Sequence, residues 1–298
     1  MSPALHRRLY ALWMREGIGG IIRHGLRRPS LRQRFVARYA PKAGPGLEIG
    51  PSHSPLAPKA QGFHVEILDH AGAAELREKY QNAGVNIDHI EDVDYIWQGQ
   101  SLPETIGRRD CYDWIIASHV IEHTPDLAGF LADCQALLRA TGRLILVVPD
   151  KRYCFDHFQS LTSTGDVLDA HSLHRTRASP GRVFDHYANA VKKGRIGTIS
   201  WHRHAPGSLQ PVHDFASARD AWRAAQTEHA YVDVHNWRFT PESFRLVIDD
   251  LRDLGVLELG IADGPATAAG EFCVCLQRDA GNHRDRITAL EAVAGSAR

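Results

Sequence analysis

Residues 47–55 have the sequence LEIGPSHSP, a short apolar run that ends in glycine, proline and small polar residues. This pattern is typical of a buried strand followed by a tight turn. Four further strand-like runs follow, separated by helix-like or crossover segments: FHVEILD at 63–69, an alternating stretch at 90–97, DWIIAS at 113–118 and RLILVVP at 143–149. Strands that alternate with helices favour a parallel sheet covered on both faces. We therefore expect a doubly wound α/β fold.

The spacing of apolar residues over 127–138 predicts a helix, and Gly142 is expected to end it. After residue 150, the sequence no longer shows strand-like and helix-like segments in alternation. An unstructured loop across all of 151–239 is improbable in a compact domain. We expect this segment to be an inserted substrate-binding or lid subdomain with helices of its own, one of them at 216–226.

A clear helix pattern begins again at Thr240. This residue is a good N-cap, and Pro241 suits the first helical position. The apolar stripe of this helix ends at Gly255, and two more strands are expected near 256–261 and 271–277. The expected sheet thus has seven, mostly parallel strands. The predicted parts of the chain are a basic helical arm at 1–42, a main domain at 43–150 and 240–278, the insertion at 151–239 and a tail at 279–298.

Charge and cysteine content limit the classes of function. Lys plus Arg and Asp plus Glu each number 35, and this balance argues against a globally basic nucleic-acid binder. Five scattered cysteines without a secretory signal indicate thiols in a reducing compartment, and we expect a cytoplasmic protein. Cys273 and Cys275 are one residue apart in an apolar run, so both should lie on the same face of a strand.

The arm at 1–42 has ten basic residues and one acid, with apolar residues interleaved. Three interpretations stay open. The arm is a solvated helix packed on its own domain, a basic amphipathic helix in peripheral contact with a membrane or partner, or a targeting segment.

Candidate ligand-binding residues follow the first two strands. In an open α/β sheet, ligands bind beyond the carboxyl ends of the strands, where the strand order reverses. Gly50 begins a turn of small residues, and Asp69, about 20 residues later, suits the hydroxyls of a ribose. Ser52 stands where a dinucleotide fingerprint would have its second glycine, so a cofactor without phosphates fits better. A plain tight connection between strands is the alternative.

Taken in order, LEIGPSHSP, ILDH, ASHVIEHTPDL and GRLILVVPDKRY resemble a class I S-adenosylmethionine-dependent methyltransferase. The likeness covers roughly 44–150 and 240–278, and HVIEH at 119–123 is typical of the branch that methylates small molecules. It implies a Rossmann-like fold and S-adenosyl-L-methionine as the cofactor. The residues that the resemblance places around this cofactor are Glu48, Gly50 and Ser52 at the methionine side, Asp69 at the ribose, Gln98 and Gln100 near adenine, and Ser118 and His119 at the sulfonium end. The sequence departs from the family at Ser52 and Ser54, where glycine is usual, and in the very short connection at 51–62.

Histidines at 119 and 123 are candidates for the chemistry. Methyl transfer is a displacement that needs alignment, but a hydroxyl acceptor also needs a base. His119 and His123 are four residues apart at the start of an expected helix and would share one face if the helical turn has begun there. Either is a candidate base, with positioning favoured for His119. The alternative for His123 is that it and Glu122 merely cap the helix.

The turn after the fifth strand and the end of the insertion supply candidate acceptor contacts. Asp150, Arg152 and Tyr153 are expected to orient a polyhydroxyl or phosphorylated acceptor, against the alternative of a solvated loop with one salt bridge. His235 and Trp237 are expected to close over the acceptor, against simple packing. The insertion contains nine of the 18 histidines but no compact set of ligands, so no metal site is predicted.

These observations favour O-methylation of a small polar acceptor such as a sugar, glycolipid or natural product. N- or S-methylation of another metabolite is the second hypothesis, and a non-catalytic cofactor-binding accessory protein is the third. No nucleic-acid partner is expected. The sequence does not predict the oligomeric state.

Overall fold

The computed structural model describes residues 29–194, 198–201, 208–227, 231–268, 270–281 and 284–296. Most of the predicted basic arm, up to position 28, lies outside these residues. The described chain begins with helix α2 (Leu31–Tyr39), where the side chains of Ser30 and Gln33 form a capping box. No helix among the described residues has the length and apolar character needed to cross a membrane.

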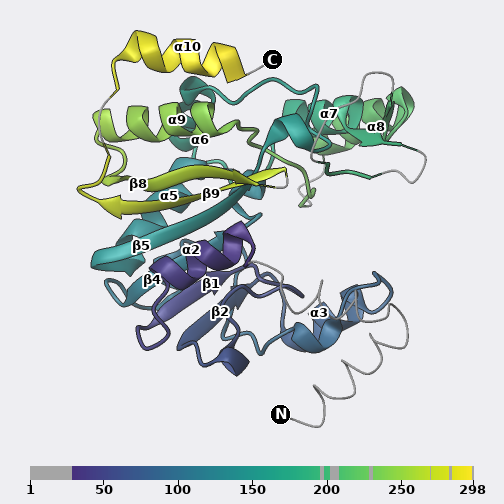
Figure 1. Ribbon diagram of the computed structural model, residues 1–298. Helices are drawn as coiled ribbons and strands as arrows, with labels where there is room; N and C mark the ends of the chain where they lie inside the picture. Colours follow the sequence, from purple (N-terminus) through teal and green to yellow (C-terminus); the bar gives the residue numbers. More distant parts are fainter. Residues whose placement is uncertain are drawn as a thin grey trace, which may run out of the picture.

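A seven-stranded sheet forms the centre of the molecule (Figure 1), with the order β3-β2-β1-β4-β5-β9-β8. The strands are β1 (Gly46–Ile49), β2 (Val65–Asp69), β3 (Tyr95–Ile96), β4 (Tyr112–Ser118), β5 (Leu138–Pro149), β8 (Leu259–Ala268) and β9 (Glu271–Arg278). The first five are parallel, whereas β9 runs antiparallel to both of its neighbours. This arrangement confirms the doubly wound, mostly parallel sheet.

Helices cover both faces of the sheet. The helices described after α2 are α3 (Ala73–Tyr80), α4 (Leu102–Ile106), α5 (Leu127–Leu137), α6 (Thr164–Ser172), α7 (Pro180–Asn189), α8 (Phe215–Thr227), α9 (Pro241–Asp253) and α10 (Arg286–Ser296). Helices α5 and α9 lie on one face of the sheet and α2 lies on the other. Helix α9 has the predicted Thr240 cap and Pro241 start, and Gly255 follows it with a φ of +70°. The helix predicted at 216–226 is α8.

The central strands divide their side chains between two cores. In β5, Leu144, Leu146 and Val148 pack on the side of α5 and α9, whereas Ile145 and Val147 pack on the side of α2. This alternation is what a strand buried on both faces requires. Cys273 and Cys275 of β9 lie together in the α2-side core, as their spacing predicts.

Three predicted boundaries are wrong. Strand β8 runs over Leu259–Ala268 instead of 256–261. Helix α5 ends at Leu137 rather than at Gly142, because Leu138 already pairs with Tyr112 at the start of β5. Strand β3 consists of Tyr95 and Ile96 alone instead of most of 90–97. Between β1 and β2 there is only a 3-10 helix, Lys59–Gln61, in agreement with the short connection expected there.

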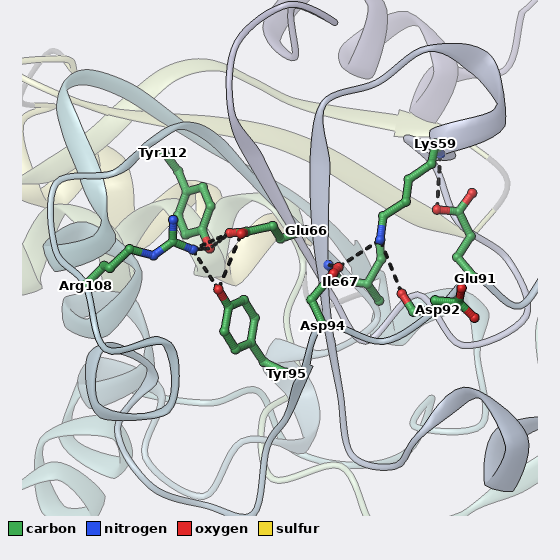
Figure 2. A network of polar contacts seen from close by, with 9 residues as sticks. All are labelled: Lys59, Glu66, Ile67, Glu91, Asp92, Asp94, Tyr95, Arg108 and Tyr112. Atoms are coloured by element: carbon green, nitrogen blue, oxygen red, sulfur yellow. Dashed lines mark hydrogen bonds and ion pairs between the residues drawn. The ribbon is translucent and has the colours of Figure 1, made fainter.

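Polar contacts hold the chain before β3 beside β2, because two residues of strand pairing give little anchorage (Figure 2). The Asp94 carboxylate accepts hydrogen bonds from the Ile67 amide (2.7 Å) and from Lys59 Nζ (2.8 Å). Lys59 also donates through its backbone amide to Glu91 and through Nζ to the Asp92 carbonyl. This edge of the sheet is therefore fixed by side chains as well as by the ladder.

A second polar group in Figure 2 joins β2, β3 and β4 around Glu66. The Glu66 carboxylate accepts hydrogen bonds from Tyr95, Arg108 and Tyr112, and Arg108 also donates to the Tyr95 hydroxyl at 2.7 Å. These contacts tie β3 to the sheet, and the residues after it are thereby placed at the carboxyl edge.

The insertion leaves and rejoins the sheet at this same edge, since the Lys151 amide donates to the Phe239 carbonyl at 2.9 Å. Its first helix, α6, adds Val167 and Ala170 to the main core. Helices α7 and α8 pack together to one side of the sheet in Figure 1, near the small hairpin of β6 (Val191–Lys193) and β7 (Leu209–Pro211). The boundaries proposed for the insertion stay a prediction.

Candidate active site

The loop after β1 lies where the strand order reverses, between β1 and β4. Gly50 has a φ of +64°, and a Cβ at this position would lie 3.0 Å from Val120 Cγ2. Ser52 also has a positive φ, 47°. Glycine therefore lets the β1 loop approach the β4 loop closely. A residue with a Cβ at position 50 would press against Val120 and force these two loops apart.

Asp69 fixes this loop from the end of β2. Its carboxylate accepts a hydrogen bond from the Ser52 amide at 2.9 Å through Oδ2, and from the His70 amide at 2.8 Å through Oδ1. His70 Nδ1 lies 2.6 Å from the same Oδ1. Asp69 therefore holds the strained backbone of Ser52 in place, and its predicted contact with a ribose would be made from this position.

Glu48 shapes the far end of the same loop. It is 1% exposed, and its two oxygens accept hydrogen bonds from the amides of Leu56 (2.7 Å) and Ala57 (3.1 Å). Burial raises the pKa of Glu48 to about 7, against the opposing effect of these two amides. Glu48 thus binds the chain's own backbone, and the predicted contact with the methionine part of the cofactor is untested.

The raised pKa of Glu48 predicts a pH-dependent stability. Because the folded protein holds this proton up to about pH 7 and the unfolded chain releases it near 4.5, the contribution is complete at low pH and is lost as the pH rises through 7. The loss by pH 8 should be on the order of 3 kcal/mol. Glu48→Gln keeps a neutral side chain at every pH but accepts one amide bond fewer. Urea unfolding of both proteins without cofactor should show the wild type losing stability relative to Glu48→Gln as the pH rises from 5 to 8, so that the difference between them changes by on the order of 3 kcal/mol. A gap that stays constant across this range would show that Glu48 does not titrate as described.

Gln98 and Gln100 are exposed at the carboxyl edge, just after β3. The Gln98 amide donates to Gln100 Oε1 at 3.2 Å, and the Trp97 indole donates to the Gln100 carbonyl at 2.7 Å. This turn and Asp69 both lie at the carboxyl edge of the sheet. The predicted proximity to adenine is compatible with this position and stays a prediction.

Ser118 ends β4, and His119 follows it with a φ of +55°. His119 Nε2 lies 2.9 Å from Glu271 Oε2, and its Nδ1 lies 3.4 Å from Glu122 Oε1. Arg32 of α2 pairs with the same Glu271 carboxylate. Burial alone would lower the pKa of His119, but the two carboxylates raise it to about 9. His119 is therefore a cation at neutral pH and a poor base, which agrees with the positioning role favoured for it.

Glu122, His123 and His235 form a cluster beside this network, termed the EHH cluster below. Each offers one ligand atom, and these atoms lie within 4.8 Å of one another. The His123 and His235 rings meet edge to face, with centroids 4.7 Å apart. His123 lies in a 3-10 turn, Ile121–His123, and α5 begins only at Leu127. The expectation that two histidines share one helical face is therefore wrong, because the turn before α5 is not α-helical.

The turn after β5 is held by its own ion pair. Asp150 is fully buried, and its oxygens accept hydrogen bonds from Arg152 Nε (2.9 Å) and Nη2 (2.6 Å). Lys151 is also buried and donates to the His157 carbonyl at 2.9 Å. Asp150 therefore orients Arg152 rather than facing an acceptor, and only Arg152 and Tyr153 remain half-buried at this turn.

His235 and Trp237 are both buried. The Trp237 indole donates to the Thr124 carbonyl at 2.6 Å, and its ring packs in the main core. This corrects the expectation that Trp237 closes over the acceptor, because its donor and its ring are already used by the fold. His235 instead joins the EHH cluster, where its contact with an acceptor is untested.

Comparison with known proteins identifies the family. The model of the family described as "Methyltransferase domain" matches residues 22–247. A search of curated protein sequences finds no match.

Solved structures with a similar arrangement are distant in sequence. One is 1,6-didemethyltoxoflavin-N1-methyltransferase from Burkholderia thailandensis (11% identity, TM-score 0.41, covering 93% of this chain and 91% of that chain). Another is a SAM-dependent methyltransferase from Aquifex aeolicus (10%, 0.38, 85% and 94%), and a third is the mitomycin 7-O-methyltransferase MmcR (14%, 0.38, 91% and 60%). At these scores they carry no argument about the site.

The family match extends over most of the chain, from before β1 into α9, and includes the loops after β1, β2 and β4. The chain belongs to the methyltransferase-domain family and is an S-adenosylmethionine-dependent methyltransferase.

Proposed function

We propose that the enzyme O-methylates a small polar acceptor of the sugar or glycoconjugate class. The observation that carries this proposal is the EHH cluster at the carboxyl edge, next to the loops expected to hold the cofactor. When bound, S-adenosylmethionine supplies an electrophilic methyl group. An alcohol attacks such a group well only when its proton is removed, whereas a neutral amine needs no such help.

The surroundings of His123 suit it to accept the proton of an alcohol. Its Nδ1 lies 2.8 Å from Asp233 Oδ1, a contact with the distance but not the alignment of a hydrogen bond. Burial lowers the pKa of His123, but Asp233 and Glu122 outweigh this and raise it. A carboxylate behind an imidazole fixes the ring and stabilises its charged form. We infer that the acceptor hydroxyl loses its proton at this cluster.

Half-buried Arg152 and Tyr153, at the end of β5, support the choice of a polyhydroxyl acceptor. Asp150 fixes the Arg152 guanidinium, whose planar donors suit hydroxyl or phosphate oxygens. The acceptor class rests on this chemistry and on the polar composition of the insertion.

An acceptor screen tests the proposal. Purified protein with S-adenosylmethionine would be offered sugars, phenols, amines and thiols, and mass spectrometry would locate the methyl group. We expect methyl ethers, and His123→Gln should lower the rate by about 100-fold or more. His171→Gln is the matched control, because His171 Nδ1 also faces a carboxylate (Asp126, 2.9 Å) but lies outside the cluster. Transfer only to nitrogen or sulfur, with His123→Gln near the normal rate, would favour the second hypothesis. Cofactor binding without any transfer would favour an accessory protein.

A further inference from the structure

The Glu122 carboxylate has an unusual position for a charged group. Its residue is 0% exposed, and neither oxygen accepts a hydrogen bond from the described residues. His119 Nδ1 lies 3.4 Å from one oxygen, near enough for attraction but without hydrogen-bond alignment. A buried carboxylate without hydrogen bonds is costly unless another group compensates it. The free oxygens of Glu122 thus indicate a ligand.

The two histidines of the EHH cluster are oriented by carboxylates behind them. His235 Nδ1 lies 2.5 Å from Asp156 Oδ2, and Asp156 is itself 1% exposed and bound by Gln159 Nε2 at 2.6 Å. A ring that donates its Nδ1 proton to a carboxylate presents an unprotonated Nε2. Asp233 lies 2.8 Å from His123 Nδ1 and attracts this ring without hydrogen-bond alignment. Metal-binding histidines are typically held in this way.

Backbone contacts fix the spacing of the cluster, although its members come from segments far apart in the sequence. The Asn236 amide donates to the Glu122 carbonyl at 2.7 Å, and Asn236 Nδ2 donates to the His123 carbonyl at 3.0 Å. The Trp237 indole adds its bond to Thr124. The three side chains are therefore brought together by the fold itself, before any ligand binds.

We propose that Glu122, His123 and His235 bind one divalent transition-metal ion of the Zn²⁺ or Fe²⁺ type. One carboxylate and two imidazoles are the donors that such ions prefer, whereas Mg²⁺ and Ca²⁺ prefer oxygen ligands alone. A site with three protein ligands keeps positions open for a substrate oxygen. This inference deepens the proposed function, on which it rests, because an ion here binds the acceptor hydroxyl and lowers its pKa. His123 is then a ligand rather than the base, and the acceptor hydroxyl, with its pKa lowered by the ion, releases its proton to solvent water.

Cobalt titration of metal-free protein tests the site. After dialysis against EDTA and removal of the chelator, Co²⁺ would be added and followed by visible absorption and calorimetry. We expect one Co²⁺ per chain, with ligand-field bands that disappear when Zn²⁺ displaces it. Glu122→Gln and His235→Gln should each weaken binding by at least about 100-fold, and Asp156→Asn by about 10- to 100-fold. His171→Gln, the matched control, should bind Co²⁺ as the wild type does.

Two further measurements distinguish failure of the metal site from failure of the proposed function. They are calorimetry with S-adenosylhomocysteine on the same proteins and the location of the transferred methyl group. Binding of this ligand checks that each variant is folded and should not change with EDTA. If the wild type binds S-adenosylhomocysteine but no Co²⁺, or if Glu122→Gln and His235→Gln bind Co²⁺ as tightly as the wild type, the metal site is refuted while O-methylation by a base stands. If Co²⁺ binds as predicted but methyl groups appear only on nitrogen or sulfur, the metal site stands and the proposed function fails.

Discussion

Gly46→Ala should destabilise the protein by about 3 kcal/mol or more. A Cβ at position 46 would lie 2.1 Å from two ring atoms of Trp114 on the neighbouring strand β4. Trp114 is fully buried, and its indole donates to the Pro41 carbonyl at 3.0 Å, so the ring has nowhere to move. Because β1 and β4 flank the switch point, the same clash would disturb the loops of the active site.

Urea unfolding followed by circular dichroism measures this effect. Gly72→Ala is the matched control, because a Cβ there meets only Ile96 Cδ1 at 3.9 Å. The control should unfold close to the wild type. In the Gly46→Ala background, Trp114→Phe should recover part of the loss by removing ring atoms from the clash. Unchanged stability of Gly46→Ala would mean that the packing between β1 and β4 is looser than described.

Asp69→Asn should weaken S-adenosylhomocysteine binding by about 100-fold. The carboxylate holds the amides of Ser52 and His70, and each hydrogen bond to a charged group is worth about 1.5 kcal/mol, roughly tenfold in affinity. Asparagine can accept only one of them and loses the charge. The Asp69→Asn protein therefore loses a hydrogen bond that fixes the β1 loop, as well as the expected contact with the ribose. Calorimetry at fixed pH checks this prediction.

Asp113→Asn is the control for Asp69→Asn. Asp113 pairs with Arg139 at 2.9 Å on the surface and should leave the affinity unchanged. Equal affinity of the Asp69→Asn protein and the wild type would remove Asp69 from the cofactor site.

Local sequence patterns predicted the parts of the fold that local physics determines. The continuous apolar run from Leu144 to Val148 favours a strand buried on both faces, and the structure has it. The spacing of Cys273 and Cys275 predicts that they share one face, and both lie in the core on the α2 side. Thr240 and Pro241 start α9 because capping depends on neighbours along the chain. The length of β3 could not be predicted, since side-chain contacts from Lys59 and Glu66 replace much of its ladder.

The active site was predictable only in part. Gly50, Asp69 and His119 follow strands directly, so the topology rule for α/β sheets finds them. The contacts of Arg32 and Glu271 with His119 could not be predicted, because they depend on β9 pairing beside β5 and on α2 packing against these strands. His235 reaches Glu122 by the return of the insertion, which no spacing rule describes. The one signal in the sequence is Glu122, the acidic residue inside HVIEH, for which local spacing offers only the alternative of a helix cap.

A crystal structure of the protein with S-adenosylhomocysteine tests the central claim most directly. The account predicts the ligand at the carboxyl edge between β1 and β4, with its ribose at Asp69, its amino-acid part against the Gly50 loop and its sulfur toward His119. A ligand bound elsewhere, or an edge that stays empty at saturating concentration, would contradict the assignment of this edge as the cofactor site.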